Sequence, residues 1–241
     1  FEKYATTSEL IEDCATFQCY EDSDDAENRS MTLDTSVGYG LLTRSMRYDY
    51  LHGGDGCNSI NNSRSLGFPR AEEVWVEVAI RWSADFTTTN YACPPNDHKL
   101  IFGGTTQGNT YRWQLKVGAD SGPDHTVSVR AAGRNTAEND ERPVSGIRAS
   151  DLWDGEGHIV RLHWKHSSPA NTGANGAQEL WIDGELLYSE TGITNRTDSG
   201  AQDYINGIAL GRNKDDGPGG VLMSLWWGYA KVWTQDPGDW N

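Results

Sequence analysis

The sequence predicts an all-β protein built as a sandwich of two antiparallel sheets. Three stretches alternate apolar and polar residues with a period of two, as strands with one buried face do. Gly and Pro number 27 and 8 in 241 residues, which favours many short strands joined by turns. With 10 Trp and 10 Tyr, the chain can bury a substantial core despite a mean hydropathy of −0.67.

The three clearest strands are expected over residues 74–82, 111–117 and 158–165. In each, the apolar positions fall on one face, which we assign to the core, and the polar positions fall on the other. The core set consists of Val76, Val78, Ile80, Trp82, Tyr111, Trp113, Leu115, Val117, Val160, Leu162 and Trp164. Shorter strands are expected over 99–102, 126–130, 179–182, 185–188, 207–210 and 222–233.

Turn residues separate these strands. Asp183-Gly184 lies between two apolar runs, and because this pair tolerates the positive φ of a type I′ turn, we expect a tight hairpin there. Residues 167–176 and 212–220 lack periodicity and are expected to be exposed loops. Helix is expected only as short pieces, chiefly over 7–13, where Thr6 or Thr7 provides a cap.

The four cysteines indicate an exported protein. Cys14, Cys19, Cys57 and Cys93 contain no C-x-x-C pair, which disfavours zinc, and their even number suits two disulfides. Of the three possible connectivities we favour Cys14–Cys19 with Cys57–Cys93. Glycosylation sequons and a first residue other than Met also favour a chain that is secreted, periplasmic or at the cell surface.

The charge balance excludes one class of partner. The formal net charge is −15 and the isoelectric point is near 4.7, whereas nucleic-acid-binding proteins carry basic surfaces. No apolar run approaches the roughly 18 residues that cross a bilayer, so no membrane span is expected.

The order of segments resembles the concanavalin A-like jelly-roll sandwiches, which include laminin G-like domains, legume-type lectins, and jelly-roll glucanases and polysaccharide lyases. The likeness runs from about Val37 to Trp233. It is carried by the segments 73–82, 97–104, 157–164, 179–186 and 228–233. The resemblance implies a single jelly-roll domain over 37–241, preceded by an N-terminal extension with a cysteine loop over 1–36. This fold hosts both binding and catalysis.

The catalytic motifs of that group do not transfer to this chain. The glucanase pattern Glu-x-Asp-x-x-Glu is absent, and so is the Gln-Ile-His or Gln-Val-His strand of alginate lyases. Residues 229–232 (Tyr-Ala-Lys-Val) are only a loose echo of the tyrosine-rich closing strand. An enzymatic hypothesis therefore has to rest on the chemistry of the side chains.

The non-core faces of the three strongest strands suggest a site. If these strands are neighbours in one sheet, a basic stripe forms on an acidic protein, and such a stripe attracts uronate or sulfate groups. Two tryptophans on the same face offer stacking surfaces for sugar rings. The alternative is an outer face that is merely solvated. The proposed ligand-binding set is Trp75, Glu77, Arg81, Arg112, Gln114, Lys116, Arg161, His163, Lys165 and Trp181.

Three functions follow from this pattern. The leading hypothesis is a non-catalytic, lectin-like module that binds an acidic polysaccharide. The second is a polysaccharide lyase that cleaves a polyuronate by β-elimination, with His163, Gln114, Arg112 and Arg161 as its catalytic residues. The third is an accessory or structural subunit of a larger surface assembly, in which the sandwich binds a protein partner.

Two further expectations concern calcium and the tryptophans. Asn213, Asp215 and Asp216 supply oxygen ligands at short spacing, so they are candidates for a structural Ca²⁺ site, as is the acidic run 21–25. Trp82, Trp113, Trp164 and Trp233 are expected in the core. Trp226 and Trp227 must point to opposite faces of one strand, which leaves one of them as an exposed platform.

Overall fold

The structure is a computed structural model. It describes residues 19–22, 29–38, 42–51, 60–86, 98–104, 111–119, 126–131, 141–168, 173–193, 195, 204–211, 213–214 and 220–238. The expected helix over 7–13 lies outside these residues.

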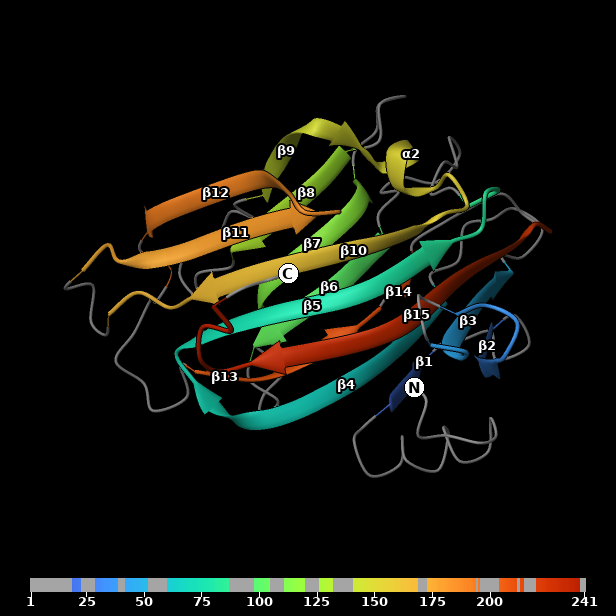
Figure 1. Ribbon diagram of the computed structural model, residues 1–241, viewed down its shortest axis with the longest axis horizontal. Coiled ribbons are helices and arrows are strands. Elements are labelled where there is room, and N and C mark those ends of the chain that lie inside the picture. The colour runs from blue at the N-terminus through green and yellow to red at the C-terminus, as the bar shows by residue number, and fades with distance from the viewer. Residues whose placement is uncertain are drawn as a thin grey trace.

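Two antiparallel sheets contain nearly all the regular structure of the described residues (Figure 1). Sheet A has the order β1-β4-β13-β6-β7-β8-β9, with β14 pairing to β4 and β6. Its strands are β1 (Cys19–Asp22), β4 (Ile60–Ala71), β6 (His98–Gly104), β7 (Tyr111–Ala119), β8 (Thr126–Ala131), β9 (Glu141–Arg148), β13 (Ile205–Leu210) and β14 (Asn213–Lys214).

Sheet B has the order β12-β11-β10-β5-β15-β3-β2 and lies in front of sheet A in Figure 1. Its strands are β2 (Arg29–Asp34), β3 (Ser45–Leu51), β5 (Glu73–Trp82), β10 (Gly157–Lys165), β11 (Gly176–Ile182), β12 (Glu185–Ile193) and β15 (Leu222–Trp233). A single turn of helix, α2 (Ala149–Leu152), links β9 to β10. The predicted all-β, two-sheet jelly-roll sandwich is confirmed. Strands β1 and β2, within the expected N-terminal extension, pair with β4 and β3.

The core lies between the two sheets and is built on tryptophan. Trp82, Trp113, Trp164 and Trp227 are completely buried. Trp113 of sheet A stacks on Trp164 of sheet B with ring centroids 6.0 Å apart and an interplanar angle of 14°. Gly103 of β6 faces the same ring, and a Cβ atom at this position would collide with Trp164. The glycine therefore makes room for the largest side chain of the opposite sheet.

The alternation predicted for the three strongest strands is confirmed where the structure describes their side chains. Val76, Val78, Ile80, Leu115 and Leu162 are at most 1% exposed and belong to the core cluster. The period of two thus identified the inward face of β5, β7 and β10.

Trp233 was expected in the core and is not there. It is only half-buried, and it lies beside Trp75 on the outer face of sheet B. The reason is a register shift between Trp227 and Tyr229, at Gly228. One extra residue reverses the alternation that follows it, so Tyr229, Lys231 and Trp233 turn outward while Trp227 stays in the core.

The predicted hairpin at Asp183-Gly184 is confirmed. Both residues have positive φ, 52° and 86°, as a type I′ turn requires. The Asp183 carboxylate accepts a hydrogen bond from the backbone N–H of Ile159 at 2.8 Å and lies 2.7 Å from Nδ1 of His158. These contacts attach the turn to the neighbouring strand β10.

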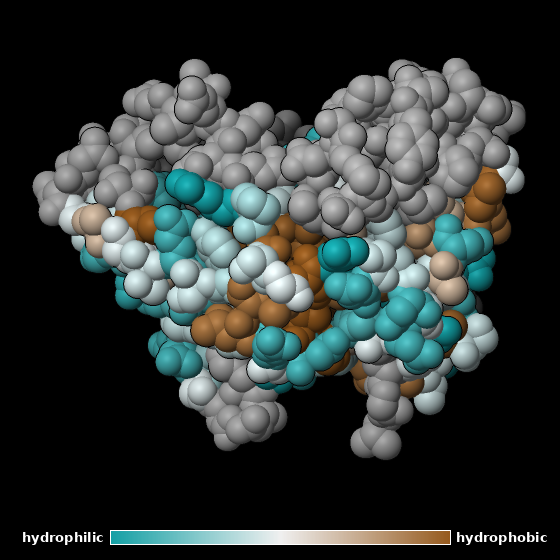
Figure 2. Space-filling model, turned by 90° about the horizontal axis from the view of Figure 1, so that it is seen from above, coloured by the Kyte–Doolittle hydropathy of each residue, from teal (hydrophilic) through white to brown (hydrophobic). Residues whose placement is uncertain are grey.

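The apolar layer between the sheets reaches the surface at one edge of the sandwich. Seen from above in Figure 2, hydrophobic surface gathers in the middle of the molecule, with hydrophilic surface on the side of sheet B. At this edge β9 and β12 lie next to each other (Figure 1). Ile147 and Leu187 of these strands pack against the core while remaining partly exposed.

A single methyl group tests the fit between the sheets. Gly103→Ala should lower the free energy of unfolding by about 1–3 kcal/mol, because the added Cβ overpacks the Trp164 ring. Gly67→Ala is the matched control in β4, where the nearest atom to the new Cβ is 4.0 Å away, and it should be nearly neutral. Urea unfolding measures both variants. Equal stability of the two would contradict the packing described for Gly103.

Candidate functional site

The expected single stripe is divided between the two faces of the sandwich. Strands β5 and β10 are neighbours in sheet B, whereas β7 is an interior strand of sheet A, between β6 and β8. The expectation that all three strands share one sheet is therefore wrong for β7. Trp75, Glu77, Arg81, Arg161, His163, Lys165 and Trp181 lie on the outer face of sheet B, and Gln114 and Lys116 lie on the outer face of sheet A. The side chain of Arg112, also in β7, is outside the described residues.

On the outer face of sheet B, Glu77 is the centre of an ion-pair cluster. Its carboxylate accepts hydrogen bonds from Arg161 Nε at 2.8 Å, from the Tyr229 hydroxyl at 2.9 Å and from Lys231 Nζ at 3.0 Å. Burial alone would raise the pKa of Glu77, but these bonds outweigh it, so the pKa falls below its usual value. Burial and the bond to Glu77 raise the pKa of Tyr229 to about 12, which does not suit proton transfer near neutral pH.

His163 is held just as firmly on this face. Its Nδ1 lies 2.7 Å from Glu179 Oε2, and its Nε2 lies 2.9 Å from Glu73 Oε1. The imidazole also stacks on Trp75, with centroids 4.8 Å apart and an angle of 10°. Since both ring nitrogens already have carboxylate partners, His163 has no nitrogen left to abstract a proton from a substrate.

The cations of sheet B therefore do not form a basic stripe. Arg161 and Lys231 pair with Glu77, and Lys165 pairs with Glu73 at 3.2 Å. Sequence reasoning missed Lys231 and Tyr229, because the register shift at Gly228 turns them toward Glu77. A glycine inside the closing strand was the available signal for that shift.

The outer face of sheet A has a different character. Gln114 and Lys116 of β7 point away from the core, yet they are only 8% and 7% exposed. Lys116 lies opposite Lys99 of β6 and opposite Ser128 of β8, and Gln114 lies opposite Phe102 of β6. Two lysines thus face each other beside an enclosed amide. This arrangement favours binding of a carboxylate.

A row of three glycines crosses sheet A near these residues. Gly67, Gly207 and Gly104 are register partners across β4, β13 and β6, in the row next to Ala209 and Phe102. A Cβ at Gly67 would have no neighbour nearer than 4.0 Å, so the row is open at its Gly67 end, whereas Gly207 is buried. Glycines within strands leave space for a ligand to approach the backbone closely.

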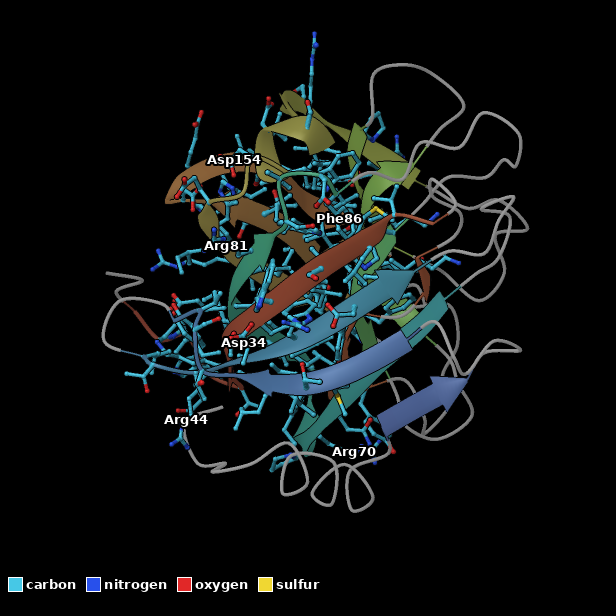
Figure 3. All side chains as sticks on the ribbon, turned by 90° about the vertical axis from the view of Figure 1, so that its right-hand side faces the viewer. Asp34, Arg44, Arg70, Arg81, Phe86 and Asp154 are labelled. Carbon is cyan, nitrogen blue, oxygen red and sulfur yellow. The ribbon has the colours of Figure 1, made fainter. Side chains whose placement is uncertain are left out.

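A second hydrogen-bonded cluster lies at the other end of sheet B, around Asp34 (Figure 3). Asp34 accepts hydrogen bonds from the indole Nε1 of Trp226 at 2.8 Å and from the hydroxyl and backbone N–H of Ser36. Arg47 lies 3.5 Å from Asp34 and 2.7 Å from Asp49. Burial would raise the pKa of Asp34, but these hydrogen bonds and the charge of Arg47 lower it to about 2.

The metal and disulfide predictions fall mostly outside the described residues. This holds for Asp215 and Asp216, for the side chain of Asn213, for Cys14, Cys57 and Cys93, and for the side chain of Cys19. Among the described side chains, no three His, Cys, Asp or Glu residues are grouped to hold a metal ion. The described part of the chain also contains no helix long and apolar enough to cross a membrane. The Ca²⁺ site and the disulfides stay predictions.

No protein-family model and no curated protein matches the chain. Solved structures do resemble it. They include an endo-β-1,4-glucuronan lyase from the fungus Trichoderma reesei (TM-score 0.67, 14% identity, 91% of each chain covered). Another is the alginate lyase Aly36B (TM-score 0.66, 11% identity, 96% of this chain and 93% of that one). A third is the PL-14 alginate lyase from Aplysia kurodai (TM-score 0.59, 11% identity, 92% and 93%). At these identities the likeness shows the fold, a concanavalin A-like jelly roll.

The Asp34 cluster makes stability depend on pH. A carboxylate whose pKa is lowered by folding stabilises the protein fully above its unfolded pKa, near 3.8, and this contribution is lost as pH falls toward about 2. Asp34→Asn should cost about 2 kcal/mol at neutral pH, and the difference from the parent protein should shrink below about pH 4. Urea unfolding over this range measures it.

The matched control is Asp85→Asn, at an exposed position of a turn. It should differ little from the parent protein at any pH. A cost for Asp34→Asn that stays constant down to about pH 2 would show that the ionised carboxylate is not the stabilising group.

Proposed function

We propose that this protein is a polysaccharide lyase that cleaves a uronate-containing polysaccharide by β-elimination on the outer face of sheet A. The observation that carries the proposal is the enclosed pair Gln114 and Lys116, on the interior strand β7 of that sheet, next to Lys99. The fold supports it, because solved structures with this architecture include a glucuronan lyase and alginate lyases.

The chemistry of the pair suits the reaction. β-Elimination from a uronate requires a group that neutralises the carboxylate, a base that takes the adjacent proton, and an acid that protonates the leaving oxygen. The Gln114 amide is a donor for the carboxylate, Lys116 lies two residues farther along β7, and Lys99 is the register partner of Lys116 on β6. Gln114 and Lys116 are about 7 Å apart along the strand, close to the span of one sugar ring. Lys116 is our candidate for proton transfer.

This assignment replaces half of the residues expected from the sequence. Gln114 and its strand neighbour Arg112 stay with the proposed site, since both belong to β7. His163 and Arg161 leave it, because they belong to sheet B and are bound to Glu73, Glu179 and Glu77. Neutralised charges on a rigid outer face stabilise the fold rather than attract a polyanion.

A direct assay tests the activity. The protein is incubated with glucuronan and with alginate, and the ultraviolet absorbance of the unsaturated uronate product is followed. A rise with either polymer supports the lyase. Binding of a polymer without any rise would favour the lectin-like interpretation, and neither cleavage nor binding would favour a protein-docking role.

Substitution separates the two faces. Lys116→Ala and Gln114→Ala should each lower kcat/KM by about 100-fold or more, since they remove a proton-transferring or carboxylate-binding group. His163→Ala on sheet B is the control and should leave kcat/KM unchanged. Thermal unfolding of each variant confirms that the fold is retained. Loss of activity with His163→Ala and not with Lys116→Ala would show that the reaction takes place on the outer face of sheet B, which would contradict our proposal.

A further inference from the structure

The outer face of sheet B contains a row of four residues in which only Arg47 belongs to an ion pair among the described residues. Arg47 of β3, Trp226 of β15, Arg81 of β5 and Gly157 of β10 are successive register partners across four strands. This row lies on the opposite side of the sandwich from Gln114 and Lys116. Figure 3 shows two of the side chains concerned, Asp34 and Arg81, on the same side of the molecule.

Trp226 is a fixed aromatic platform. Its indole N–H donates to Asp34 Oδ2 at 2.8 Å, and Asp34 is itself held by Ser36 and Arg47. The side chain is only half-buried, unlike Trp227 in the core. The outward half of the Trp226-Trp227 pair is thus oriented before any ligand arrives, which reduces the entropy lost on binding.

Arg81 is a cation without a carboxylate among the described residues. Arg47, Arg161, Lys165 and Lys231 on the same face each lie 2.7 to 3.2 Å from a carboxylate oxygen. The Arg81 guanidinium instead lies over the Trp226 ring, 5.8 Å from its centroid, and its buried Nε has no acceptor. A guanidinium donor that is removed from water and left without an acceptor is costly, so this group favours an incoming anion.

The surroundings leave room for such a ligand. The register partner of Arg81 on β10 is Gly157, which has no side chain and is exposed. The next outward residue along β5, Ala79, is small but completely buried, so it offers no surface to a ligand. The space beside the guanidinium therefore lies on the Gly157 side, away from Trp226.

We propose that Trp226 and Arg81 form a second, non-catalytic binding site for a uronate residue of an acidic polysaccharide. The sugar ring stacks on the indole, and the carboxylate pairs with the Arg81 guanidinium, whose Nε–H lacks an acceptor among the described residues. The inference extends the proposed function, because the ligand belongs to the same class of polymer, but it uses no residue of the sheet A site.

The local charge of Arg81, and not the net charge of the molecule, favours an acidic sugar over a neutral one. The chain carries a net charge of −15, so an unpaired cation is a specific local attraction for an anion rather than part of a general basic surface. A neutral sugar would use the Trp226 platform and leave Arg81 without an acceptor. A carboxylate uses both groups together.

Affinity electrophoresis in gels that contain glucuronan tests the site. All proteins carry Lys116→Ala, so that cleavage does not degrade the gel. Arg81→Gln and Trp226→Ala should each raise the apparent Kd by about tenfold, as expected for loss of a charge-assisted hydrogen bond or of a stacking surface. Lys231→Gln is the control. It removes one positive charge from the same face, but from a lysine already paired with Glu77, and it should change Kd little.

One further variant and a set of contrary results make the proposal falsifiable. Arg81→Lys keeps the charge but not the two-pronged donor, so it should recover only part of the affinity. Unchanged retardation in Arg81→Gln would overturn the proposal, and so would equal weakening by Lys231→Gln. Loss with Trp226→Ala alone would show that the sugar binds by stacking and not through its carboxylate, and would also overturn it. Thermal unfolding checks that each variant is folded, and Trp226→Phe replaces Trp226→Ala if the latter is not. Because cleavage is assayed separately, failure of the lyase proposal and failure of this one are distinguishable.

Discussion

The stack of Trp113 on Trp164 is the contact on which the rest of the structure depends. It joins an interior strand of sheet A, β7, to an interior strand of sheet B, β10, and it fits only because Gly103 has no side chain. By fixing which side of β7 and of β10 points inward, the stack also fixes the outward set on each sheet. Gln114 and Lys116 face one way, and Arg161 and His163 face the other.

The outer faces of the two sheets differ in how their charged side chains are arranged. Sheet B pairs Arg161 and Lys231 with Glu77 and Lys165 with Glu73, and it holds His163 between the carboxylates of Glu73 and Glu179. On sheet A, Lys99 and Lys116 face each other and Gln114 is enclosed. Binding of a polyanion across sheet B would disrupt these ion pairs. The Arg81 and Trp226 pair is the exception on sheet B.

Sequence reasoning succeeded where the physics is local. Alternation identified the buried sides of β5, β7 and β10, and the positive φ that Asp-Gly tolerates located the hairpin. It failed on which strands share a sheet, because a period of two records burial and not pairing partners. His163 and Gln114 therefore looked like members of one site. Only the topology separates them, and the acidic partners of His163 come from strands β5 and β11.

The register shift at Gly228 determines which face of sheet B each later residue of β15 points to. Upstream of it Trp227 is buried, and downstream Tyr229, Lys231 and Trp233 face outward. Removing one residue there would turn every residue after Gly228 to the opposite face of the sheet. Lys231 would then point into the core and Val232 would point outward. Substitutions along this strand are thus judged one position at a time, whereas an insertion or deletion near Gly228 changes every later position at once.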